Sequence, residues 1–230
     1  MEGTRLSRQE ASDAVGDIGW RFTLGALRTA VAVTSLAQAS ETAMTAVAAA
    51  AGPLADEHLW VDLRNDRAVL TVQTLATAWL TRADIDLARD ISAALAGRGL
   101  TTAPDVGSGP RSVQVIEIAI DALDIPSIRP FWRALLAYVD EPGATGPEDP
   151  IVDPLRQSPS IWFQQMDAPR PQRNRIHFDV CVPHDEAAAR MAAALAAGGT
   201  QKYDKEAPAF WVLADAEGNE ACITTWQGRD

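Results

Sequence analysis

Positively charged side chains are scarce in this sequence, and long apolar runs are absent from it. Lysine and arginine total 20 against 31 aspartates and glutamates, which gives a formal net charge of −11 at pH 7. This charge would repel a phosphate backbone, so we expect no sequence-independent binding of nucleic acid. No stretch approaches the ~20 uninterrupted apolar residues that a membrane span needs, so no membrane protein is expected.

Cysteine is rarer still, because the sequence contains only Cys181 and Cys222. The first 15 residues carry charges throughout and contain no apolar segment of the kind found in secretory signals. We therefore expect two free thiols in a cytoplasmic protein. Hydrophobic residues make up 47% of the chain, which is enough for a packed core and excludes general disorder.

Glycine and proline divide the chain into two parts. A Gly/Pro/Ser stretch between residues 97 and 110 predicts a domain over 1–97, a linker over 98–112 and a second domain over 113–230. A second proline-rich stretch, 140–159, lies inside the second domain and predicts a long loop. The acidic excess is uneven, with a net charge of −3 for residues 1–100 and −8 for residues 101–230.

The order of the expected elements predicts an α+β fold in both parts. The first part has helices and four expected strands, which we take as one antiparallel sheet; the strands are 20–23, 27–33, 57–63 and 67–74. The last helix of this part begins at Thr81, with Asp84 at the capping-box position. The second part repeats a strand, a helix and further strands, and its expected elements are 113–121, 126–138, 160–166, 175–182, 185–197, 210–214 and 220–226.

Residues 5–95 resemble the pterin-4a-carbinolamine dehydratase family. The most specific stretch resembles the family's Leu-Thr-x-x-Asp-Ile-x-Leu-Ala ending and runs over residues 80–88; the others are Gly19-Trp20, Leu27-Arg28 and the segment 56–60. The resemblance implies a pterin ligand and a carbon–oxygen lyase, the 4a-hydroxytetrahydrobiopterin dehydratase.

That family removes a 4a-hydroxyl group with an acid near the departing oxygen and a base near N5, and three histidines supply them. Here only His58 matches, because Glu57 and Leu75 stand at the other two histidine positions. Glu57 could serve as acid or base beside His58. The alternative is a domain that has lost this chemistry and keeps His58 at a surface or an interface.

Residues 113–228 resemble the glyoxalase/bleomycin-resistance (vicinal oxygen chelate) superfamily in its glyoxalase-like form. The matching pieces are 118–121 with 131–136, then 174–180, and finally 214–222, which contains Glu217-Gly218-Asn219-Glu220. The resemblance implies paired βαβββ modules that form a cup. It also implies that inward residues of the first and last strand of each module hold a divalent metal.

Strand alternation places the candidate residues independently of the resemblance. Glu117 lies on the face opposite Ile118 and Ile120, and His177 on the face opposite Ile176 and Phe178. We therefore expect both side chains in the cup, paired with each other. Gln164 and Cys222 stand at the two remaining ligand positions of the family.

Two interpretations of this cup stay open. Glu117 and His177 could hold a divalent metal, for which Zn²⁺ tolerates the mixed donor set best, or they could bind each other, a ligand or water. Trp162 and Trp226 share strand faces with Gln164 and Cys222, so we expect them as walls of the cup.

Three classes of function follow from these interpretations. The first is an enzyme, either the dehydratase or a metal-dependent glyoxalase-like enzyme. The second is a binding protein that takes up a pterin or a cationic, aromatic compound, as drug-resistance members of the superfamily do. The third is a dimerising interaction module. We expect a homodimer by analogy with both families.

Overall fold

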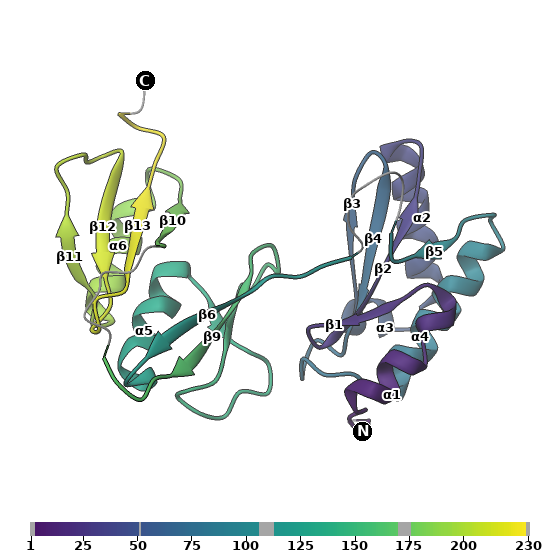
Figure 1. The fold of residues 1–230 in the computed structure, drawn as a ribbon. Coiled ribbons are helices and arrows are strands. Elements are labelled where there is room, and N and C mark those ends of the chain that lie inside the picture. Colours follow the sequence, from purple (N-terminus) through teal and green to yellow (C-terminus); the bar gives the residue numbers. More distant parts are fainter. Residues whose placement is uncertain (1–2, 51, 106–112, 170–175, 229–230) are drawn as a thin grey trace. The chain divides into compact units, whose positions relative to one another are not determined.

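The chain divides into two compact units, Met1–Val115 and Ile116–Asp230, in a computed structural model (Figure 1). The structure describes residues 3–50, 52–105, 113–169 and 176–228. None of the helices in these ranges is long and apolar enough to cross a membrane. Each unit is described by itself below.

The first unit is an antiparallel sheet with helices packed against it. The sheet order is β1-β2-β4-β3, and a short strand β5 also pairs with β2. Its elements in chain order are α1 (Arg8–Asp13), a 3₁₀ turn η1 (Gly16–Ile18), β1 (Arg21–Thr23), β2 (Ala26–Ala32), α2 (Leu36–Ala49), α3 (Leu54–His58), β3 (Leu59–Leu63), β4 (Arg67–Val72), α4 (Arg82–Ala96) and β5 (Thr102–Ala103).

Helix α4 shows why this unit holds together. Its N-terminus is the predicted capping box, in which Thr81 and Asp84 bond each other's backbone amides. One face of the helix is fully buried, and Ile85, Ile91 and Leu95 lie on it. These side chains join residues of β2, β4 and α2 in one apolar core, which includes the buried Trp20. Burial of such side chains stabilises the fold by about 1.5–3 kcal/mol each.

Two expectations for the first unit are corrected by the structure. Glu57 and His58 do not begin a strand but end the short helix α3, and β3 starts only at Leu59. Asp56 and Glu57 lie in the first turn of that helix, where carboxylates interact favourably with the helix dipole.

The expected linker 98–112 begins too early, because Thr102 and Ala103 form β5. This segment pairs in antiparallel fashion with the edge of β2. The hydroxyl of Thr102 also donates to the carbonyl of Ile18 at 2.7 Å. Residues 106–112 of the expected linker lie outside the described residues.

The second unit consists of two βαβββ modules, as the family resemblance implied. In each module the first strand pairs in parallel with the last, giving the orders β6-β9-β8-β7 and β10-β13-β12-β11. The first module contains β6 (Glu117–Ala122), α5 (Ile125–Leu136), β7 (Val139–Asp140), β8 (Ile151–Val152) and β9 (Ser160–Gln165). The second contains β10 (Phe178–Cys181), α6 (Ala187–Ala196), β11 (Thr200–Tyr203), β12 (Phe210–Ala214) and β13 (Glu220–Thr224).

The stretch 140–159 is more regular than the expected loop. It contributes the end of β7 and all of β8 to the first sheet. Two carboxylates hold its turns: Asp149 accepts the amides of Thr145 and Gly146, and Asp153 accepts the amides of Leu155, Gln157 and Ser158. Proline content alone could not reveal these local hydrogen bonds.

The strands of the second unit alternate between a core face and an open face. Core-face residues from both sheets, such as Ile120, Phe163 and Ile223, pack together with α5 and α6 in one cluster. The open face is the opposite one, and we define it by Glu117, Trp162, Gln164, Asp179, Cys181 and Cys222. The alternation predicted from the sequence is confirmed on both sheets, because the core-face residues are the ones in the cluster.

Candidate functional site

His58, the retained histidine of the first unit, is buried rather than placed at a surface. Only 7% of the residue is exposed, and its Nδ1 lies 2.8 Å from Oδ1 of Asp84, which is fully buried. Because an ionised carboxylate only accepts hydrogen bonds, Nδ1 donates to Asp84. The other carboxylate oxygen of Asp84 accepts the hydroxyls of Thr74 and Thr81 and the amide of Thr81. Asp84 thus caps α4 and fixes the imidazole ring at the same time.

Glu57 and Leu75 stand where the resembling family carries its other histidines. The structure brings these two positions together, since the amide of Leu75 donates to the carbonyl of Glu57 at 3.0 Å. The Glu57 side chain is exposed and that of Leu75 is half-buried. Leucine has no group that transfers a proton, so of the three histidine positions of the family only those of His58 and Glu57 carry a side chain for acid–base chemistry.

Glu117 lies on the open face, but the expected pair with His177 does not form among the described residues. The hydroxyl of Ser160 on the neighbouring strand lies 3.5 Å from Glu117 Oε1. Burial, and after it the charge of Glu117, raises the pKa of Glu141. The physical reason is the sheet topology: β6 and β10 belong to different sheets. Alternation fixes the face of a residue but not its neighbours in another module.

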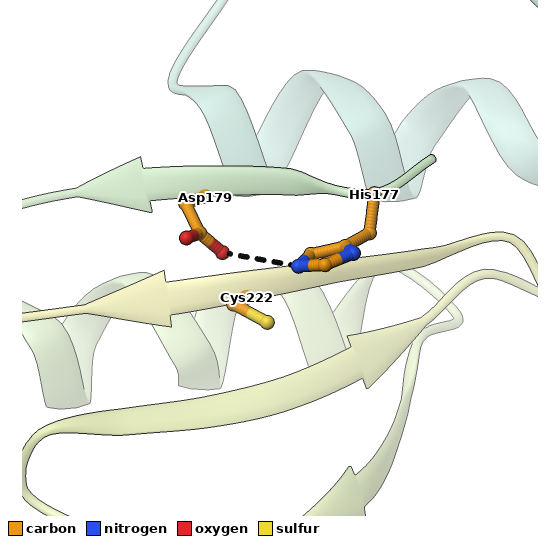
Figure 2. Close-up of side chains that lie close together, drawn as sticks. All are labelled: His177, Asp179 and Cys222. Carbon is orange, nitrogen blue, oxygen red and sulfur yellow. Dashed lines mark ion pairs between the residues drawn. The ribbon is translucent and has the colours of Figure 1, made fainter. Parts of the chain in front are cut away.

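His177 lies instead with Asp179 and Cys222, and Figure 2 shows the three side chains gathered over β10 and β13. Their ligand atoms all lie within 4.8 Å of one another, and His177 Nε2 lies 3.6 Å from Asp179 Oδ1. Asp179 and Cys222 are direct partners in the register of β10 and β13. Glu117 is no member of this group, so the two-module ligand set implied by the resemblance is not assembled in the described part of the chain.

The remaining candidates are spread over the open face and beyond it. Trp162 is half-buried beside Ala119 of β6. Gln164 is exposed, and its amide donates to the carbonyl of Gln165 at 3.2 Å. The expected strand 220–226 ends at Thr224, so Trp226 lies past it; this side chain is 63% exposed and its ring meets that of His184 edge-on at 5.5 Å.

Asp179 is the residue of this group that was not singled out from the sequence. The signal was present, because His177 and Asp179 are separated by two positions on an extended segment and therefore point to the same side. Cys181 follows the same spacing, and its sulfur accepts the hydroxyl of Thr224 at 3.0 Å. Neither cysteine is in a disulfide.

No curated protein matches the chain. Similar solved structures include a glyoxalase/bleomycin resistance protein/dioxygenase family enzyme from Burkholderia phytofirmans, with 18% identity over 47% of this chain and 95% of that one and a TM-score of 0.39. A transcriptional coactivator/pterin dehydratase from Brucella melitensis has 23% identity over 40% of this chain and 98% of that one, with a TM-score of 0.35.

The fosfomycin resistance protein FosX from Mesorhizobium loti is also similar, with 6% identity over 48% of this chain and 90% of that one and a TM-score of 0.38. The comparison with family models gives a match to the glyoxalase-like domain over residues 117–224. These residues span both βαβββ modules, from the first residue of β6 to the last of β13. Residues 117–224 therefore match the glyoxalase-like domain that the sequence motifs predicted.

Proposed function

We propose that the second unit binds a flat, positively charged small molecule on its open face. The observation that carries this proposal is the position of Trp162, an aromatic ring left half-buried on the same sheet face as the exposed carboxylate of Glu117. An indole ring attracts a cation over its face, and nearby carboxylates strengthen that attraction. The acidic excess of residues 101–230 supports the same choice of ligand charge.

The test is binding of a planar aromatic cation, with ethidium as the probe, measured by isothermal titration calorimetry. We expect saturable binding that Trp162→Leu weakens about tenfold, because a cation–π contact contributes about 1–2 kcal/mol and 1.4 kcal/mol is a factor of ten. Trp211→Leu is the matched control, since Trp211 lies on β12 and its side chain packs against the core rather than on the open face. Absence of saturable binding, or equal losses in both variants, would contradict the proposal.

For the first unit we propose that carbinolamine dehydration is weak or lost. The support is Leu75, which stands at a proton-transfer position and carries no titratable group. General acid–base help contributes about 10²–10⁴-fold per positioned group. We therefore expect a kcat at least about 10²-fold below that of a histidine-complete dehydratase in the same 4a-hydroxytetrahydropterin assay.

A variant that restores the two missing histidines tests this prediction directly. The double change Glu57→His with Leu75→His restores both missing side chains at positions whose backbones are already hydrogen-bonded to each other. It should raise the rate if the rest of the site is intact. A wild-type kcat comparable to that of the histidine-complete enzyme, abolished by His58→Ala, would instead establish an active dehydratase.

A further inference from the structure

The group formed by His177, Asp179 and Cys222 has the composition of a transition-metal site. Imidazole nitrogen, carboxylate oxygen and cysteine sulfur are the three donor types that bind Zn²⁺ in proteins. Mg²⁺ and Ca²⁺ prefer oxygen donors only, so the sulfur and nitrogen atoms select against them. We propose that these three residues bind a Zn²⁺-type divalent ion within the second module alone.

The separation of His177 and Asp179 fits two ligands of one tetrahedral ion, and the sulfur of Cys222 lies close to both. Ligand bonds of about 2.0–2.3 Å at tetrahedral angles separate donor atoms by about 3.4–3.7 Å. His177 Nε2 and Asp179 Oδ1 are 3.6 Å apart, and all three donor atoms lie within 4.8 Å of one another. A separation of 3.6 Å is too long for a hydrogen bond between these two groups, whereas it matches two ligands of a shared ion.

The backbone holds two of the ligands rigidly. Asp179 and Cys222 lie opposite each other on paired strands in the parallel ladder of β10 and β13. Cys222 is only 6% exposed, while His177 and Asp179 are exposed. The ion would therefore rest on the sulfur at the sheet surface and keep its fourth position toward solvent, as in zinc sites that bind water or a substrate.

This ligand set differs from the one that the family resemblance implied. That set drew on both modules through Glu117, Gln164, His177 and Cys222, whereas Glu117 lies beside Ser160 on the neighbouring strand. Asp179, two positions after His177, supplies the carboxylate in its place. The metal site does not depend on the proposed binding of an organic cation, and it is tested with the metal ion alone.

A cysteine–histidine nucleophile is the other chemistry that this group could support. It requires a third side chain that orients the imidazole through a hydrogen bond. The separation between His177 and Asp179 is beyond that range, and the sulfur is mostly covered. The geometry therefore favours the metal ion.

The experiment is titration of the full-length, chelator-treated protein with Co²⁺ and Zn²⁺. We expect one ion per chain, with the thiolate-to-cobalt charge-transfer absorption that reports a sulfur ligand. Cys222→Ser should abolish that absorption, and Asp179→Asn should weaken Zn²⁺ binding at least about 100-fold, because loss of a mere outer-shell partner already costs about 10–100-fold. Asp179 is exposed, so its variant should fold, and circular dichroism of each metal-free variant checks this.

Two matched controls decide between this site and its alternatives. Cys181→Ser removes the chain's other thiol, which lies on β10 and accepts the hydroxyl of Thr224, and should leave the absorption and affinity unchanged. Glu117→Gln removes the carboxylate of the two-module set and should also have no effect. The proposal is overturned if no stoichiometric ion binds, if the absorption survives Cys222→Ser, or if Glu117→Gln weakens binding as much as Asp179→Asn does.

Discussion

Replacing Asp84 with alanine should lower the free energy of unfolding of the first unit by about 3–5 kcal/mol. The carboxylate is fully buried and accepts hydrogen bonds from His58, Thr74 and Thr81. Its removal leaves the buried imidazole of His58 without its hydrogen-bond acceptor and abolishes the capping box at the N-terminus of α4. Each of these losses is costly because water cannot replace the missing acceptor.

Asp86→Ala is the matched control for this prediction, because Asp86 lies on the same helix with a side chain that is 56% exposed. Its surface ion pairs with Arg82 and Arg89 should contribute no more than about 1 kcal/mol. Urea denaturation of the full chain, with hydrogen exchange of the α4 amides, assigns the loss to the first unit. Equal effects of the two variants would show that the buried network adds no stability.

Replacing Asp215 with alanine should destabilise the second unit by about 2–4 kcal/mol. This carboxylate is 2% exposed and lies in the turn between β12 and β13. It accepts the indole N–H of Trp132 at 2.9 Å and the amides of Glu217 and Asn219 at 3.0 and 2.9 Å. The variant leaves the N–H of a fully buried tryptophan unsatisfied and loosens the turn.

The loss of stability should extend to both modules, because Trp132 belongs to α5 of the first module and its acceptor Asp215 belongs to the second. Glu217 strengthens the same junction by accepting the amides of Leu123 and Asp124 just before α5. Hydrogen exchange should therefore show α5 and β13 losing protection together. Asp204→Ala, which removes an exposed bond to Gln201, is the control; loss of protection confined to the second module would contradict the coupling.

The sequence predicted the open face of the second unit well, because strand alternation is a local property. Glu117, Gln164 and Cys222 all lie on the expected side of their strands. The two βαβββ modules were implied by the family resemblance, because the hydrophobic pattern alone did not reveal the short strands β7, β8 and β11. The motif around Glu217-Gly218-Asn219 lies at the β12–β13 turn, where Asp215 organises the backbone.

Contacts between distant segments could not be predicted in this way. The capping role of Asp84 follows from its spacing to Thr81, but its bond to His58 joins positions 26 residues apart and depends on how α3 packs on α4. The expected pairing of Glu117 with His177 was wrong because alternation gives no information about which sheet a strand joins. Asp179 was within reach of sequence reasoning, since it shares its strand face with His177.

The parallel pairing of β6 with β9 and of β10 with β13 has a consequence for synthesis on the ribosome. Glu117 pairs with Ser160, and Phe178 pairs with Ala221. The first strand of each module is therefore synthesised dozens of residues before the strand with which it pairs. Hairpins of the first unit, such as β3 with β4, join neighbouring segments and close early. A nascent chain thus carries a finished first unit while β6 still exposes an unpaired edge, the kind of surface that chaperones protect. Until residues 221–224 have been synthesised, β10 lacks the strand with which it pairs.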